Sequence, residues 1–250
     1  MRYRLPLLAF SILCLVRLAA AQDVAPEKPL YQPAGNEATI TGAINVTGDV
    51  PARRRLDMSA DPVCVGINSR PLLDDLIVSD NKLKNAFVYL KSETLRGYRF
   101  AVPDSDVELQ HRNCYYSPHV LGILVGQKLS IVNSDQTTHN THPTPKYNPE
   151  WNMSLPPNVP PFEKTFTRPE VFIPVKDNQH PWERAYIGVM AHPFFAVTDE
   201  FGRFEIHGVP PGTYTLVVWH ERLGEQQVEI TVAPYEVRNA DFTYDADKKP

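Results

Sequence analysis

The sequence predicts an all-β protein made of two successive β-sandwiches. Its 250 residues contain 24 Pro and 12 Gly, and long stretches with helical periodicity are few. Short segments in which apolar and polar residues alternate recur along the chain, as they do in half-buried strands. The last fifty residues repeat a strand–turn–strand pattern that is complete enough to form a small sandwich of its own.

Residues 1–21 have the layout of a secretory signal peptide. Two arginines precede an apolar stretch, and three alanines end the segment at Ala21. The apolar stretch is too short to span a membrane. We therefore expect a periplasmic or secreted protein without a membrane span, which begins with a polar, Pro-containing and flexible leader over residues 22–37.

Charge and cysteine content narrow the function classes. Without residues 1–21 the chain has 22 Lys and Arg against 29 Asp and Glu, a formal charge of −7, so no basic stripe for nucleic acid is expected. Two cysteines remain, Cys64 and Cys114, and in an oxidising compartment a disulfide between them is the first interpretation. Two separate buried thiols, or a metal site with His111 and His119 beside Cys114, are the alternatives.

The first sandwich is predicted over residues 38–192, including an N-terminal strand segment. Alternating or apolar runs predict its strands at 39–46, 76–78, 86–90, 106–110, 119–125, 128–133, 162–166, 171–175 and 185–190. Gly126-Gln127 predicts a tight turn. Residues 138–165 are rich in Pro and Asn and are predicted to be a loop, and a loop of that length in a compact domain is usually functional.

The second sandwich, residues 193–250, is predicted from its turns. Asp199-Glu200-Phe201-Gly202 is a hairpin turn between alternating strands, and Pro210-Pro211-Gly212-Thr213 leads into an apolar strand. Strands at 226–232 and 241–244 complete the pattern. It resembles the carboxypeptidase regulatory-like domain, a transthyretin-like module, and the resemblance implies folding support or contact with a protein or carbohydrate. The short junction at 190–193 predicts rigid packing of the two sandwiches.

Residues 84–192 resemble the cupredoxin-like part of secreted bacterial proteins. The motifs that carry the resemblance are Cys114-Tyr115-Tyr116-Ser117-Pro118-His119-Val120, Gly126-Gln127, Asn133-Ser134-Asp135, His139-Asn140-Thr141-His142, Pro169-Glu170-Val171, His180-Pro181-Trp182 and Ala185-Tyr186-Ile187-Gly188-Val189. The resemblance implies a Greek-key β-sandwich in which His139 and His180 are imidazole ligands of copper. Asp177 and Glu183 stand where that family has the Cys and Met ligands.

The missing sulfur ligands change the chemistry that the resemblance implies. A blue copper centre needs a thiolate ligand, so type 1 electron transfer is not expected. Two imidazoles with the carboxylates of Asp177 and Glu183 suit zinc or non-blue copper instead, and His142 is a further candidate ligand close to His139. The alternative is a decayed site with solvated acidic residues and histidines bonded to the backbone.

The sequence favours a non-catalytic binding or structural protein. It contains neither a nucleophile elbow nor a phosphate-binding Gly loop. A copper-handling or electron-transfer protein is one alternative, and a protein- or carbohydrate-binding module is another. A protein partner would use the Pro-rich loop at 143–161 with Tyr147, Trp151 and Phe162, whereas a carbohydrate would use a strip formed by Tyr115, Tyr116 and Trp151.

Overall fold

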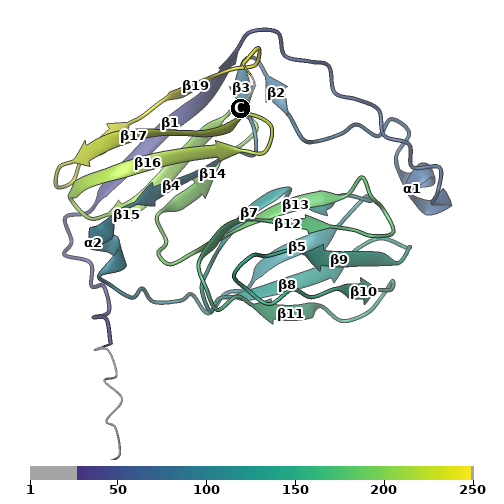
Figure 1. Ribbon diagram of the computed structural model, residues 1–250, viewed down its shortest axis with the longest axis horizontal. Coiled ribbons are helices and arrows are strands. Elements are labelled where there is room, and N and C mark those ends of the chain that lie inside the picture. Colours follow the sequence, from purple (N-terminus) through teal and green to yellow (C-terminus); the bar gives the residue numbers. More distant parts are fainter. Residues whose placement is uncertain (1–26, 249–250) are drawn as a thin grey trace, which may run out of the picture.

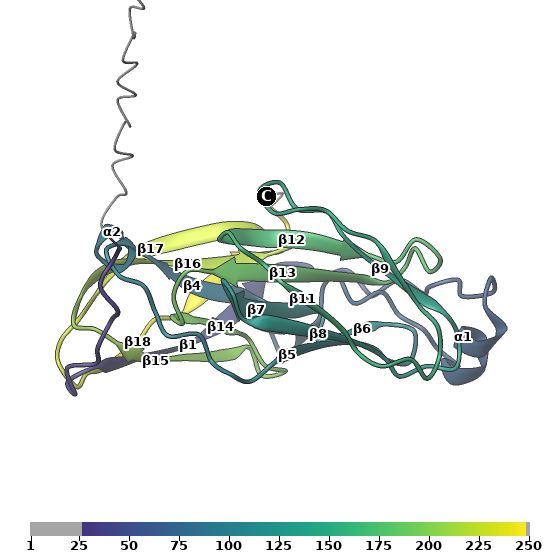
Figure 2. The same cartoon turned by 90° about the horizontal axis from the view of Figure 1, so that it is seen from below.

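The protein folds as two β-sandwiches with two short helices at opposite ends of the molecule (Figure 1, Figure 2). The computed structural model describes residues 27–248, so the predicted signal peptide at 1–21 lies outside the described residues. The helices are α1 (Pro62–Ile67) and α2 (Glu93–Arg96). Among residues 27–248, neither helix has the length and apolar character needed to cross a membrane. Apart from these two short helices, the regular elements of the described residues are strands, so the predicted all-β class is confirmed.

The first sandwich consists of two sheets with the strand orders β10–β9–β12–β13–β7 and β11–β8–β5–β6. Its strands are β5 (Val107–His111), β6 (Tyr116–Ser117), β7 (Val120–Leu124), β8 (Lys128–Asn133), β9 (His139–Pro143), β10 (Met153–Leu155), β11 (Phe162–Thr165), β12 (Glu170–Lys176) and β13 (Arg184–Met190). β5 pairs with β8, and β7 with β13, in parallel. Side chains such as Leu109, Ile131 and Ile187 fill the space between the sheets.

The second sandwich combines strands from both ends of the chain. Its strands are β1 (Ala38–Thr47), β2 (Val78–Ser79), β3 (Lys82–Leu83), β4 (Phe87–Lys91), β14 (Phe195–Val197), β15 (Arg203–Val209), β16 (Gly212–His220), β17 (Gly224–Val232), β18 (Val237–Asn239) and β19 (Phe242–Asp245). β1 pairs with β15, β18 and β19, and β4 lies between β14 and β16. The first sandwich is thus an insertion between β4 and β14.

This pairing corrects the predicted boundary at residue 192, which placed the N-terminal strands in the first sandwich. Ile40, Ile44 and Val46 of β1 are fully buried, and they belong to the same core as Leu216 and Val218 of β16. The C-terminal strands need these apolar side chains to close their core. Contacts so distant in sequence leave no mark on local periodicity, so the boundary could not be placed from it.

Two further expectations differ from the structure. The described part of the predicted flexible leader is mostly exposed but is attached at Tyr31. Tyr31 donates its backbone N–H to the carbonyl of Arg99, and the centroid of its ring lies 5.2 Å from that of Phe100. The predicted loop at 138–165 contains β9 and β10. β9 has the sequence His-Asn-Thr-His-Pro and is largely buried although most of its side chains are polar. A search for alternating apolar residues therefore misses it.

The two sandwiches meet at a pair of glycines. Gly122 of β7 and Gly188 of β13 are neighbours in register. A Cβ atom at Gly122 would lie 2.2 Å from Phe195, and one at Gly188 would lie 2.6 Å from Phe87. The rings of Phe87 and Phe195 stack with centroids 5.5 Å apart. The glycines therefore let aromatic rings of the second sandwich lie directly on the backbone of the first.

We predict that Gly188→Val lowers the free energy of unfolding by about 2–3 kcal/mol, because its side chain overlaps the Phe87 ring and the interface is overpacked. Urea unfolding followed by circular dichroism measures this loss. Gly66→Val is the matched control, since a Cβ atom there meets nothing within 4 Å. A Gly188→Val midpoint equal to that of the wild type would contradict the packing described.

A buried ion-pair cluster also joins the sandwiches. His119 precedes β7, and its Nε2 bonds to Glu221, which follows β16. Its Nδ1 lies 3.2 Å from the Asp74 carboxylate, an ion-pair distance without hydrogen-bond alignment. Burial by itself lowers the pKa of His119, but the two carboxylates raise it by more, to about 10. His119 is therefore an imidazolium at neutral pH.

We predict that His119→Ala loses about 3 kcal/mol of stability at pH 6, because two mostly buried carboxylates lose their cation. The folded-state pKa is raised, so this contribution is complete below the unfolded value of 6.5 and disappears as the pH rises through about 10. Unfolding of both proteins across this range measures the difference. The exposed His207, paired with Glu205, is the control, and His207→Ala should cost less than about 1 kcal/mol. A pH-independent deficit would refute the assignment.

Candidate metal centre

The structure brings together four of the five predicted metal ligands at one end of the first sandwich. His139 begins β9, whereas Asp177, His180 and Glu183 belong to the loop that joins β12 to β13. All four are buried, with exposed fractions between 0% and 3%. This burial contradicts the alternative of a decayed site with solvated acidic residues.

The fifth predicted ligand, His142, lies outside this group. Its Nε2 is 2.6 Å from Glu150, and its Nδ1 contacts Asn178. Side chains alternate between the two faces of a strand, so residues three apart point to opposite faces. His142 is three residues from His139 in β9, which is why the expectation that both would face the same ion was wrong.

The imidazole nitrogens and carboxylate oxygens of the four buried residues converge. Nδ1 of His139 lies 3.2 Å from Asp177 Oδ2 and 3.0 Å from Glu183 Oε1. Nδ1 of His180 lies 3.3 Å and 3.8 Å from the same two oxygens. Ligands of a tetrahedral zinc ion with bonds of about 2.0–2.1 Å are about 3.3–3.4 Å apart. These four nitrogen–oxygen distances are in the range for ligands of one small cation. His111, His139, Asp177 and Glu183 also each offer a ligand atom within 4.8 Å of the other three.

The loop that carries three of these residues is folded around Asp177. Its Oδ1 accepts hydrogen bonds from the backbone N–H groups of Gln179 and His180, at 2.7 and 2.9 Å. Its Oδ2 accepts one from the N–H of Asn140 in β9, at 2.9 Å. Asp side chains favour such local turns. The result is a tight turn in which side chains three residues apart, at 177, 180 and 183, point to one place.

Two further carboxylates hold the outer nitrogens of the histidines. Nε2 of His139 lies 3.0 Å from Asp135 Oδ2, and Nε2 of His180 lies 3.0 Å from Asp61 Oδ2. A metal-bound histidine commonly donates its other N–H to a carboxylate, which fixes the tautomer and the ring orientation. Here that arrangement directs both Nδ1 atoms toward Asp177 and Glu183. Neither Asp61 nor Asp135 was singled out as a site residue from the sequence.

Asp135 is itself held by an unusual piece of backbone. Asn113 and Cys114 both have a φ of 56°, in the left-handed region that costs non-glycine residues energy. In this conformation their consecutive N–H groups donate to Asp135 at 2.7 and 2.8 Å. The strained turn thus places the carboxylate that positions His139.

His111 completes the buried cluster. Its Nδ1 lies 2.8 Å from Glu183 Oε2, and its Nε2 lies 2.7 Å from the Thr141 hydroxyl. With one carboxylate oxygen held in this way, Glu183 Oε1 is left as a buried oxygen without a hydrogen-bond partner among residues 27–248. Its unpartnered oxygen is the one that faces Nδ1 of His139. The sequence had suggested His111 only as a neighbour of Cys114.

The cluster requires positive charge. It buries three carboxylates, with the partly buried Asp61 beside them, among three imidazoles, and a buried carboxylate without a counter-charge is costly. Burial alone raises the pKa of Asp177, but bonds from His139 and His180 bring it well below its usual range. Burial lowers the pKa of His139, while Asp135, Asp177 and Glu183 raise it to about 11. Protons on the imidazoles, or a cation between Nδ1 atoms and carboxylates, supply the charge.

The predicted disulfide is confirmed, and it covers the cluster. Cys64 and Cys114 are bonded, with Cα atoms 5.7 Å apart, so the alternatives of separate thiols or a cysteine metal site do not apply to this form. Both are fully buried in one cluster with Met58 and Trp182. Trp182 donates its indole N–H to the carbonyl of Cys114 at 3.1 Å. Asp61 caps α1, which places this helix over the site.

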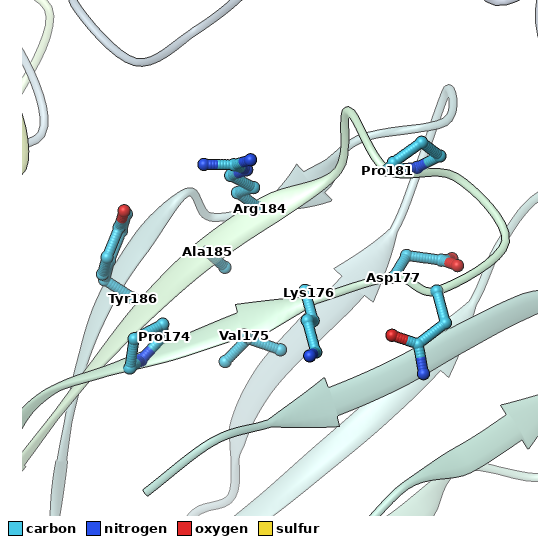
Figure 3. A pocket seen from close by; sticks show the side chains of 9 residues that line it. Pro174, Val175, Lys176, Asp177, Pro181, Arg184, Ala185 and Tyr186 are labelled. Carbon is cyan, nitrogen blue, oxygen red and sulfur yellow. The ribbon is translucent and has the colours of Figure 1, made fainter.

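A pocket of about 380 Å³ borders the site at Asp177 (Figure 3). It lies along β12 and β13, and its wall includes the exposed side chains of Lys176 and Arg184, which face each other across the two strands. Asp177 is at the end of this pocket nearest the loop that carries Pro181 (Figure 3). The cluster therefore adjoins a hollow on the protein surface at Asp177.

The aromatic strip proposed for carbohydrate binding does not form. Tyr116 is 3% exposed, and its hydroxyl donates to the carbonyl of Asn140 beneath the surface. Trp151 packs against Phe162, with ring centroids 5.5 Å apart. Of the aromatic residues suggested for a protein partner, Tyr147 is well exposed, at 64%.

Comparison with known proteins yields partial matches. The family model for polysaccharide lyase family 4, domain II (fn3_3), matches residues 169–239. The match includes β12 and β13 of the first sandwich as well as most of the C-terminal strands, so it does not follow the predicted carboxypeptidase regulatory-like domain. No match was found among the curated proteins.

Several solved structures are similar to part of the chain. They include a Cu-containing nitrite reductase from Thermus scotoductus SA-01, with 21% identity, a TM-score of 0.32 and coverage of 40% of this chain and 27% of that one. A purple cupredoxin from Nitrosopumilus maritimus has 22% identity, a TM-score of 0.30 and coverages of 34% and 100%. An oxidised amicyanin mutant has 17% identity, a TM-score of 0.31 and coverages of 41% and 98%. Likenesses of this strength carry no argument about the site.

Proposed function

We propose that the protein is a non-catalytic metal-binding protein that holds one zinc or non-blue copper(II) ion. The ligands are Nδ1 of His139 and His180 and one oxygen each of Asp177 and Glu183. The observation that carries the proposal is the approach of both Nδ1 atoms to the same two buried carboxylate oxygens, with the Glu183 oxygen left without a hydrogen-bond partner among the described residues. A cation supplies both the missing partner and the missing charge.

The donor set supports this choice of ion. Imidazole and carboxylate together suit zinc and copper(II), whereas calcium takes six to eight oxygens. The sulfurs of Cys64 and Cys114 are bonded to each other, so they do not supply the thiolate of a blue copper centre. Four protein ligands in a buried place make a closed set, which is typical of structural rather than catalytic zinc sites.

We further propose that the protein acts in the periplasm or outside the cell. The buried disulfide supports this, because disulfides persist in oxidising compartments. The signal-peptide pattern of residues 1–21 points the same way. In that compartment, the first sandwich would bind zinc or copper(II) at its end beside α1.

We predict that the metal-free chain from Gln22 onward takes up one equivalent of zinc or copper(II), and that the copper form lacks an intense blue band. His139→Ala combined with His180→Ala should abolish this uptake, because both nitrogen ligands are lost. His142→Ala should retain it, since that side chain contacts Glu150 and Asn178 instead. Calorimetric titration with each metal measures the uptake by the wild type, the double variant and His142→Ala. Equal uptake by the double variant would rule the site out.

We also predict that Asp135→Asn weakens zinc binding about 10–100-fold without changing the stoichiometry, because the outer nitrogen of His139 loses its anionic partner. Competition against a zinc chelator gives the two affinities. Asp104→Asn, at an exposed position, is the matched control and should leave the affinity unchanged. If Asp135→Asn binds zinc as tightly as the wild type, Asp135 does not position His139.

A further inference from the structure

The sulfur atoms of the disulfide lie close to the same histidines that face the proposed metal. Sγ of Cys64 and ligand atoms of Asp61 and His180 all lie within 4.8 Å of one another. Sγ of Cys114 and ligand atoms of Asp135 and His139 do the same. Asp61 and Asp135 bond Nε2 of the two rings, whereas the proposed zinc or copper(II) site uses Nδ1. The sulfurs are therefore grouped with the carboxylates on the outer side of the rings, and we call the Nδ1 side, with Asp177 and Glu183, the inner set.

The backbone keeps both cysteines in place independently of the S–S bond. Cys64 donates its N–H to Asp61 at 3.2 Å, and Cys114 donates its N–H to Asp135 at 2.8 Å. Asn68 adds a link between the two segments, because its side-chain amide donates to the carbonyls of Cys64 and Asn113. Breaking the disulfide therefore leaves two thiols anchored at the same place.

The surroundings of the sulfurs suit a soft ion. Cys64 and Cys114 are fully buried, and Met58 and Trp182 pack against them in one apolar cluster. Thiolate ligands select copper(I) over harder ions. Two sulfurs bound to one ion at about 2.3 Å each can be at most about 4.6 Å apart. Rotation of the two side chains reaches that separation from Cα atoms that are 5.7 Å apart.

We propose that reduction of the Cys64–Cys114 disulfide creates a second metal site, in which the two thiolates and a ring nitrogen of His139 or His180 bind copper(I). The site shares its histidines with the proposed function but does not require a divalent ion in the inner set. A dithiol reductant breaks the S–S bond by transferring two electrons and two protons and becomes a disulfide itself. Each thiol that binds copper(I) then releases its proton to water.

The test compares copper(I) binding by the reduced and the oxidised chain from Gln22 onward. A phosphine serves as reductant; it takes the oxygen of one water molecule to become a phosphine oxide, and the disulfide receives the two electrons and two protons. Competition with a chromogenic copper(I) chelator gives the affinity, and copper X-ray absorption identifies the ligand atoms. We expect that, at one chelator concentration, the reduced protein removes copper(I) from the chelator and the oxidised protein removes none. The absorption spectrum of the reduced form should show sulfur bound to copper.

Two variants separate this site from the inner one. Cys64→Ser with Cys114→Ser should bind copper(I) no better than the oxidised wild type, and that oxidised protein serves as the control if the variant does not fold. Asp177→Asn with Glu183→Gln should lose zinc binding yet keep the copper(I) uptake of the reduced form. Equal copper(I) affinity of reduced and oxidised wild type, or absorption spectra without sulfur neighbours, would overturn the proposal. The zinc titration, made without reductant, decides the inner site separately.

Discussion

Two buried carboxylates that face two imidazoles are the constraint on which this end of the protein depends. Asp177 and Glu183 are buried, and their oxygens lie close to Nδ1 of His139 and His180. Such a group is stable only when positive charge balances it. The metal ion that we propose here would supply that charge and would join the four residues into one unit.

The rest of the structure serves to keep the two rings turned inward. Asp135 and Asp61 hold the outer nitrogens, and the strained turn at 113–114 and the start of α1 hold those two carboxylates. The segment with α1 leaves the second sandwich after β1, reaches across the end of the first and returns to β2 (Figure 1). Strands from the chain's N-terminal part thus belong to one sandwich while their connection closes the site of the other.

The sequence was informative where the signal is local. Apolar alternation located most strands to within one or two residues, and the resemblance to cupredoxins singled out His139, His180, Asp177 and Glu183, which the structure places close together. It failed where the deciding contact is distant or polar. β9 is buried among hydrogen-bonding partners, Asp61 reaches His180 across 119 residues, and β1 finds its partners near the other end of the chain. Hydrophobic periodicity carries no information on such contacts.

The most direct test of the central claim is anomalous diffraction at the zinc absorption edge from crystals of the chain grown with zinc. We expect a single strong peak enclosed by Nδ1 of His139, Nδ1 of His180 and the carboxylates of Asp177 and Glu183. An empty cluster, with zinc bound only at histidines outside it such as His142 or His207, would contradict this expectation. In that case protons alone would balance the buried carboxylates.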